Sequence, residues 1–351
     1  MKNYKKIFIS AFLVFAIQAV SIYAAPEKLP KWVDDYNSVY PDSDWVAVVE
    51  SASSKQAADS KAAGALASRF KVDVAATTQA AESLSRAVSG GKSSYAQNSS
   101  VSKQTDTSSN VSGLMGVTVD SFVSKDGTAY ACARMNRKEA GTAYSNIIKE
   151  NNNVITGLQK DAAANKGTFE AYECLAVATD IAVLTDNQLE ILSVLNPAMR
   201  DSIKVSYGNA NTLKKAALDN TKSIVISVQV ETNADDSGRI KKALQKVFTT
   251  RGFRTTDKPD SKSYILETML RITDAPIQNQ NKFVRYEITS AISDSSGTEL
   301  FTFSATGREG HLNYTEAIER ALRRVESSIG DADDEESFTS VFNEYLVSLL
   351  K

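Results

Sequence analysis

Three long segments of alternating polar and apolar residues in the last third of the sequence constrain its fold most. They span Ser261–Asp274, Lys282–Ser293 and Thr298–Arg308. Alternation with a period of two is the pattern of strands that bury one face only. A polar loop joins the first two segments, and the turn sequence Asp294-Ser295-Ser296-Gly297 joins the second pair. These segments therefore predict neighbouring antiparallel strands.

The residues before these strands predict one more strand and a helix. Ser223–Glu231 has the apolar content of a strand, and a helix is expected over Arg239–Arg251. Ser237 is expected to cap the beginning of this helix, and Gly252 stands where a glycine ends a helix.

Two further helices are expected after the strands. Asn313-Tyr314-Thr315-Glu316 is a capping box that opens a helix to about Ser328. An acidic turn precedes a last amphipathic helix, whose apolar residues are Phe338, Val341, Phe342, Tyr345 and Leu349. The order β-α-β-β-β-α-α predicts a curved antiparallel sheet with helices on one face.

The first part of the sequence predicts a second, smaller α+β domain that ends near residue 138. A buried strand is expected over Asp42–Glu50, followed by a helix to Phe70 whose capping box is Ser53 and Gln56. The helix places small and apolar residues on one face: Ala58, Ala62, Ala65, Leu66 and Phe70.

A polar stretch separates this helix from a hairpin. Lys71–Ala76 is predicted to start a strand, and residues 83–112 form a long polar loop or a weakly held helix. Gly113–Val123 and Thr128–Arg137 are then paired strands around the turn Lys125-Asp126-Gly127.

Residues 139–196 have helical periodicity and predict a helical hairpin packed on one or both domains. Asn151-Asn152-Asn153 is expected to interrupt its first helix, and Pro197 ends its second. The fold class is therefore α+β, with two small domains joined by the hairpin. The predicted boundaries are a signal peptide at 1–24, a first domain at 25–138, the hairpin at 139–200 and a second domain at 201–351.

The N-terminal segment has the three parts of a secretory signal. Lys2, Lys5 and Lys6 precede the apolar run Ile7–Val20, and small residues follow it. Cleavage after Ala24 is preferred to cleavage after Ala25, which would leave Pro26 first; an uncleaved membrane anchor is the alternative. The expected localisation is exported, either periplasmic or outer-membrane-associated, where cytoplasmic ATP and NAD are not at hand.

The composition excludes several kinds of site. His311 is the single histidine, and there are two cysteines, so a His-rich metal site and a four-thiolate cluster are excluded. The net charge of −2 does not favour nucleic-acid binding. His311 is expected to be a surface or cap residue, and no G-x-S-x-G motif accompanies it. No catalytic residue, cofactor or metal is predicted.

Three local patterns resemble ligand sites incompletely. Gly90-Gly91-Lys92-Ser93 lacks the first glycine of a phosphate loop, because Arg86 stands there, and a flexible loop is expected. The acidic run 331–336 precedes a helix, where negative charge is favourable, so a solvated first turn is preferred to a weak cation site. The start of a calcium loop is also present, but Leu244 replaces its closing glutamate; its residues are Asn233, Asp235, Ser237 and Gly238.

The two cysteines leave two alternatives open. Cys132 lies in the predicted hairpin and Cys174 in the helical segment. In an oxidising compartment they form either a disulfide that ties the first domain to its helices or two buried free thiols.

The first domain resembles the Lpp-twenty family of bacterial envelope lipoproteins over Leu29–Ile148. The resemblance rests on Pro30-Lys31-Trp32-Val33, on Trp45-Val46-Ala47-Val48-Val49, and on the alanine-rich helix Ser54–Phe70 with its exit Lys71-Val72-Asp73-Val74. It also covers Gly127-Thr128-Ala129-Tyr130-Ala131-Cys132-Ala133-Arg134, which is similar to the last strand of the family. The chain departs from the family in lacking the lipid-modified cysteine and the usual glycine near Val49.

The second domain is similar to the N-terminal domain of TolB. The similarity rests on Ala243-Leu244, Arg251-Gly252-Phe253 and Tyr264-Ile265-Leu266. The order of the two modules resembles that of flagellar assembly protein T. These resemblances imply a non-enzymatic envelope protein that assembles or bridges other proteins.

The expected function is protein–protein contact with envelope or flagellar proteins, with no nucleic acid as partner. Homo-oligomers and contact with a membrane are left open. Exposed sheet edges, the polar segment 83–112 and the C-terminal helix are the expected contact surfaces. The alternatives are an exported hydrolase with a carboxylate site and a small-ligand binder that uses the space between the domains.

Overall fold

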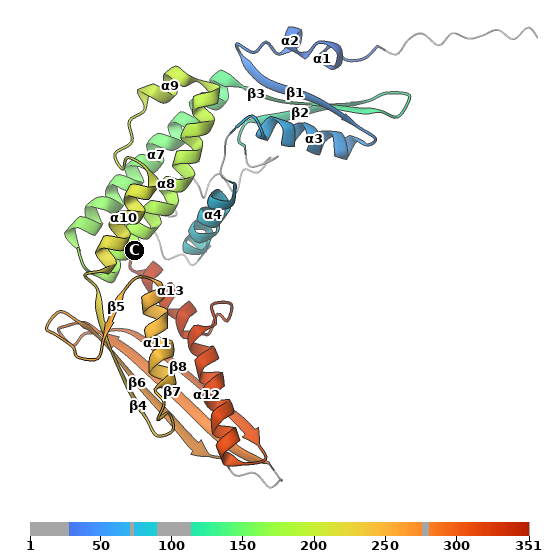
Figure 1. Cartoon of the computed structure of the whole chain (residues 1–351). Coiled ribbons are helices and arrows are strands. Elements are labelled where there is room, and N and C mark those ends of the chain that lie inside the picture. Colours follow the sequence, from blue (N-terminus) through green and yellow to red (C-terminus); the bar gives the residue numbers. More distant parts are fainter. Residues whose placement is uncertain (1–27, 71–73, 90–113, 276–280, 351) are drawn as a thin grey trace, which may run out of the picture.

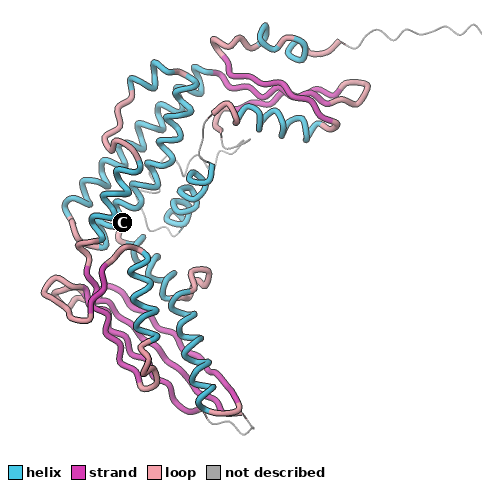
Figure 2. Tube along the Cα trace, viewed as in Figure 1, coloured by secondary structure: helices cyan, strands magenta, loops and turns pink. Residues whose placement is uncertain are grey.

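The computed structural model describes residues 28–70, 74–89, 114–275 and 281–350, and it has the predicted α+β class. Figure 1 shows an elongated, arched arrangement of three parts. A three-stranded sheet lies at one end, a helical layer in the middle and a five-stranded sheet at the other end (Figures 1 and 2).

The N-terminal sheet has the order β1-β3-β2 and is antiparallel throughout. Its strands are β1 (Trp45–Ala52), β2 (Val117–Val123) and β3 (Ala129–Asn136). Helix α3 (Lys55–Ala67) covers one face, where Ala58, Ala62 and Leu66 are fully buried. The short helices α1 (Lys31–Asp34) and α2 (Tyr36–Val39) precede β1. The hairpin β2–β3 is confirmed, and Gly127 adopts a φ of +87° in its turn.

Two predictions for this domain are wrong. The N-cap of α3 is Ser54, whose side chain accepts from the Ala57 N–H, and not Ser53. Gln56 then lies one position too early to close a capping box. Val74–Ala76 begins helix α4 (Val74–Ser89) rather than a strand, since the alanines and Gln79 that follow favour helix.

The helical layer is built on two long antiparallel helices, α7 (Arg137–Ala164) and α8 (Phe169–Leu195). Helix α7 continues through Asn151, so the predicted interruption is wrong. The buried Asn151 amide donates to Thr185 Oγ1 at 3.1 Å and to Gln188 Oε1 at 3.3 Å, both on α8. These partners satisfy the polar group that was expected to break the helix.

Three shorter helices complete this layer. Pro197 ends α8 as predicted and stands at the first position of α9 (Pro197–Ser202). Helices α10 (Ala210–Thr221) and α4 both pack against α8. Residues 210–221 therefore lie in the helical layer, although the domain boundary at 200 stays a prediction.

The C-terminal sheet has the order β5-β4-β6-β7-β8. Its strands are β4 (Val225–Thr232), β5 (Arg254–Thr256), β6 (Tyr264–Asp274), β7 (Lys282–Ser293) and β8 (Glu299–His311). The three predicted long strands are confirmed as an antiparallel meander. The sheet as a whole is mixed, however, because β4 runs parallel to β5 and β6. The crossover through α11 (Arg239–Thr250) brings the chain back in the direction of β4.

Helices α11, α12 (Tyr314–Gly330) and α13 (Phe338–Ser348) lie on one face of this sheet (Figures 1 and 2). Gly252 follows the end of α11 with a φ of +84°, and Asn313 caps α12 by accepting from the Glu316 N–H at 2.8 Å, both as predicted. Ser237 does not cap α11. Asp235 Oδ2 accepts the Ile240 N–H instead, while the Ser237 hydroxyl donates to Asp235 Oδ1.

Candidate functional site

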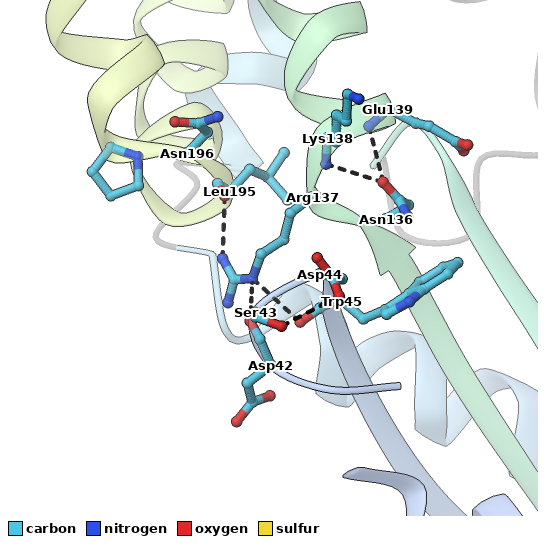
Figure 3. Close-up of a pocket in the computed structure, with 11 residues that line it drawn as sticks. Asp42, Ser43, Asp44, Trp45, Asn136, Arg137, Lys138, Glu139, Leu195 and Asn196 are labelled. Carbon is cyan, nitrogen blue, oxygen red and sulfur yellow. Dashed lines mark hydrogen bonds between the residues drawn. The ribbon is translucent and has the colours of Figure 1, made fainter. Parts of the chain in front are cut away.

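A pocket of about 730 Å³ lies where the N-terminal sheet meets the helical layer (Figure 3). It is formed by the loop before β1, the junction of β3 with α7, and the junction of α8 with α9. Its lining residues are Asp42, Ser43, Asp44, Trp45, Asn136, Arg137, Lys138, Glu139, Leu195, Asn196 and Pro197.

The Arg137 side chain joins these three segments. Its Nε donates to the carbonyl oxygen of Asp42 at 2.8 Å and to that of Trp45 at 3.3 Å. Its Nη1 donates to the carbonyl oxygens of Val194 and Leu195 at the end of α8. The Arg137 N–H also donates to the Asp44 carbonyl at 2.8 Å. A cation at this position satisfies the unpaired carbonyls of a helix C-terminus.

The polar groups at this pocket are thus largely used within the protein. Asn136 Oδ1 accepts the N–H groups of Lys138 and Glu139 at 3.0 Å, and Asn196 Oδ1 accepts that of Met199. The geometry suits a structural contact that fixes the N-terminal sheet on the helices. We call this contact of Arg137 with Asp42, Trp45, Val194 and Leu195 the Arg137 joint.

A second polar cluster covers the face of the N-terminal sheet opposite α3. Arg134 Nε donates to Asp120 Oδ2 at 2.8 Å, and Tyr40 Oη donates to the same oxygen at 3.1 Å. The Arg134 guanidinium also lies over the rings of Tyr40 and Trp45. The hydrogen bond from Arg134 lowers the pKa of Asp120. This charge-assisted network fastens the segment before β1 to the sheet.

Cys132 and Cys174 are free, buried thiols, so the disulfide alternative is not realised. Cys132 lies in β3, and Cys174 belongs to the core of the helical layer. Burial, with the negative charge of Asp120, raises the pKa of Cys132 to about 11. Burial raises the pKa of Cys174 to about 12. A thiol with such a pKa is a poor nucleophile.

The remaining candidates are not assembled into one site. His311 ends β8 beside Lys282, and its Nδ1 is buried without a hydrogen-bond partner. The Asp235 carboxylate already accepts a hydrogen bond from the Ile240 N–H in the first turn of α11. Within the described ranges, no group of three or more His, Cys, Asp or Glu residues is placed to hold a metal ion.

Among the described residues, two carboxyl groups of α8 have raised pKa values, the buried Glu173 and the partly buried Asp186. Burial, with the nearby charge of Asp180, raises the pKa of Glu173 to about 7. Burial also raises the pKa of Asp186, which accepts from Tyr207 Oη and from the Ala210 N–H, both at 2.9 Å. Neither carboxyl lines the pocket at Arg137 or the hollow on the C-terminal sheet.

The face of the C-terminal sheet opposite α11, α12 and α13 is covered by no helix or strand in the part of the chain that the structure describes (Figure 2), and we call it the bare face. It holds a hollow of about 790 Å³. Exposed residues of β4, β6, β7 and β8 form it, among them Gln229, Glu231, Glu267, Met269, Thr289, Thr302 and Ser304.

Strand β8 is the long edge of this sheet. It has 13 residues and pairs only with β7 among the described strands. An edge strand presents unpaired N–H and C=O groups along one side. Neither proline nor lysine occurs in β8, and its exposed side chains include Thr302, Ser304 and Thr306. This edge is open to pairing with another extended chain.

The C-terminal helix is not a contact surface of the expected kind, and that prediction is wrong. Phe338, Phe342 and Leu346 of α13 are buried in the core of the C-terminal domain. Its apolar face is therefore already covered by the sheet and by α8.

Several predictions fall outside the described residues. These are the signal segment with Ala24 and Ala25, the Gly90-Gly91-Lys92-Ser93 motif, and the polar segment 83–112 beyond the end of α4 at Ser89. Within the described part of the chain, no helix is long and apolar enough to cross a bilayer.

Sequence reasoning missed the Arg137 joint, the bare sheet face and helix α10. A basic residue directly after a strand carries no signal of a distant helix end. The bare face had a signal, because polar residues alternate with apolar ones along much of the three long strands, as Thr302, Ser304 and Thr306 do in β8.

No protein-family model matches the chain, and no curated protein matches it. Among solved structures, a minor lipoprotein from Acinetobacter baumannii is 14% identical, with a TM-score of 0.21, over 36% of this chain and 87% of its own. A secreted protein from Helicobacter pylori is 14% identical, with a TM-score of 0.37, over 85% of this chain and 97% of its own.

Proposed function

We propose that this protein is an exported, non-enzymatic protein of the bacterial cell envelope that works by binding other proteins. The signal-like sequence of residues 1–24 supports export. The resemblances to the Lpp-twenty family, to the N-terminal domain of TolB and to the domain order of flagellar assembly protein T support an envelope or flagellar partner.

The open edge of β8 is the observation that carries the proposal. A partner segment in extended conformation adds a strand there, so that main-chain hydrogen bonds supply affinity. The small hydroxyl side chains of Thr302, Ser304 and Thr306 leave room for such a segment. The rigid support behind β8 comes from α12, which packs on it.

Site-specific photo-crosslinking in cells tests this function. A photoreactive residue at Thr302 or Ser304 is expected to form an adduct with another exported envelope protein, whose identity mass spectrometry gives. The same photoreactive residue at Lys246 or Thr249, two exposed positions of α11, is the matched control. Adducts that arise equally from the α11 positions, or none from β8, would contradict a partner at this edge.

Processing of the N-terminal segment is tested separately. Fractionation is expected to place the protein outside the cytoplasm, with a mature N-terminus at Ala25. A protein that keeps residues 1–24 and stays in the cytoplasm would contradict export. It would leave the proposed binding of a partner at β8 unaffected.

A further inference from the structure

The bare face of the C-terminal sheet has its charges sorted into two halves. The strand register places residues of neighbouring strands in rows across the face. The rows nearest the start of β6 contain Glu267 and Glu299, and Glu231 lies in the middle row, opposite Met269. The rows toward the end of β6 contain Arg271, Arg285 and Arg308. We call these two sets the acidic half and the basic half.

The charges of both halves are without ion-pair partners among the described residues. The basic half also contains Glu287, which lies opposite Arg271 in the β6–β7 register but forms no salt bridge with it. The other side of the domain differs, since Arg239 of α11 pairs there with Glu319 and Glu326 of α12. The bare face therefore keeps charge that a partner can neutralise.

Shape matches this division of charge. The hollow of about 790 Å³ lies over the acidic half and is lined by Glu231, Glu267 and Glu299. In the basic half, the Arg308 guanidinium lies over the Phe283 ring at 5.2 Å, which holds that side chain on the face. Met269, which is 37% exposed, is a large apolar group beside the middle of the sheet.

We propose that this face binds the same face of a second copy of the chain, in antiparallel orientation about a twofold axis. The rotation places the basic half of each copy on the acidic half of the other, so arginine side chains enter the hollows. A wholly basic partner would neutralise the glutamates alone and leave the arginines uncompensated. The proposal goes beyond the binding function assigned to β8 and does not depend on it.

The size of the face suits such a dimer. Strands β6, β7 and β8 have 11, 12 and 13 residues, and β4 has 8. At about 3.4 Å per residue and about 4.8 Å between strands, they cover roughly 700 Å². Stable protein–protein interfaces bury about 800 Å² on each partner. The isologous contact requires only one such patch on each copy.

Two charge-reversal variants test the pairing. The first, E231K/E267K/E299K, makes the face basic except at Glu287, and the second, R271E/R285E/R308E, makes it acidic. We expect the unmodified protein to sediment as a dimer at low salt and to dissociate as salt rises, because screening weakens contacts between exposed charges. Each variant alone is expected to self-associate at least about tenfold more weakly, since like charges then face each other.

Mixing the two variants is the decisive measurement. A mixture is expected to form a one-to-one heterodimer, whose formation restores the association that each variant lost. A reversal at a distant helix position, K246E, is the matched control and is expected to leave the dimer unchanged. Circular dichroism and thermal unfolding of each variant establish that it is folded.

Three outcomes would overturn the proposal. They are a monomeric unmodified protein at low salt, variants that still dimerise, or folded variants that do not bind each other when mixed. A monomeric unmodified protein that binds a basic peptide through the same glutamates would replace the second copy with a different occupant.

Discussion

Phe169 and Tyr264 stack with their ring centroids 4.3 Å apart and their planes inclined by 30°. Phe169 is the first residue of α8, and Tyr264 begins β6. Phe169 also contacts Phe253, Phe342 and Tyr345 edge-on. A residue of the helical layer thus belongs to the aromatic core of the C-terminal domain, which fixes these two parts on each other.

The first prediction concerns the Phe169 ring in this aromatic core. Phe169→Ala is expected to lower the free energy of unfolding by about 3–5 kcal/mol, because it removes a buried ring and leaves a cavity. Denaturant unfolding followed by circular dichroism measures the change. The control is Glu170→Ala on the next, partly exposed position, which is expected to change stability by less than about 0.5 kcal/mol. Equal effects of the two substitutions would argue against a stabilising role of the Phe169 ring.

The second prediction concerns the joint at Arg137. Arg137→Met is expected to cost about 2–3 kcal/mol, because carbonyl groups of Asp42, Val194 and Leu195 lose a charged donor. Arg137→Lys keeps the charge but not the fork of donors, so an intermediate loss is expected. The exposed neighbour provides the control, Lys138→Met. Hydrogen exchange in β1 and the end of α8 is expected to speed up only in the Arg137 variants.

Local signals in the sequence predicted most of the elements. Gly252 and Asn313 mark helix ends by their own backbone and side-chain chemistry, and the β2–β3 turn depends on residues that are adjacent in the sequence. Such features need no knowledge of the rest of the fold. The strands β6 to β8 were predictable for the same reason, because alternation is a property of each segment.

The errors occurred where tertiary contacts decided the outcome. Asn151 was predicted to break a helix, yet Thr185 and Gln188 from another helix satisfy it. The parallel pairing of β4 with β6 depends on where α11 returns the chain. The candidate surfaces show the same limit: the edge of β8 and the bare face exist only once the strand order and the helical cover are known.

The third prediction concerns the two cysteines. Cys132 and Cys174 are expected to resist alkylation in the native protein, because both are buried and burial raises their pKa values. In denaturant without reductant, both thiols are expected to react. Reductant should leave the melting temperature unchanged. An unfolded protein that shows no reactive thiol until it is reduced would instead demonstrate the disulfide.

The last prediction concerns the pH dependence that Glu173 imposes. Burial raises the pKa of Glu173 from 4.5 to about 7 in the folded protein, and Asp180 adds to the effect while Arg251 opposes it. Between these two values the folded state holds a proton that the unfolded state has lost. Stability therefore falls as pH rises through this window, by up to about 3 kcal/mol at 1.36 kcal/mol per pKa unit.

Glu173→Gln removes this titration. Its free energy of unfolding is expected to change much less between pH 4.5 and 7 than that of the unmodified protein. Above pH 7 the variant should be the more stable of the two, because the unmodified protein then buries a charged carboxylate. Denaturant unfolding across this range gives the comparison, with the partly exposed Glu170→Gln as control. If Glu173→Gln and Glu170→Gln gave the same pH profile, the buried carboxyl would not be the group that titrates.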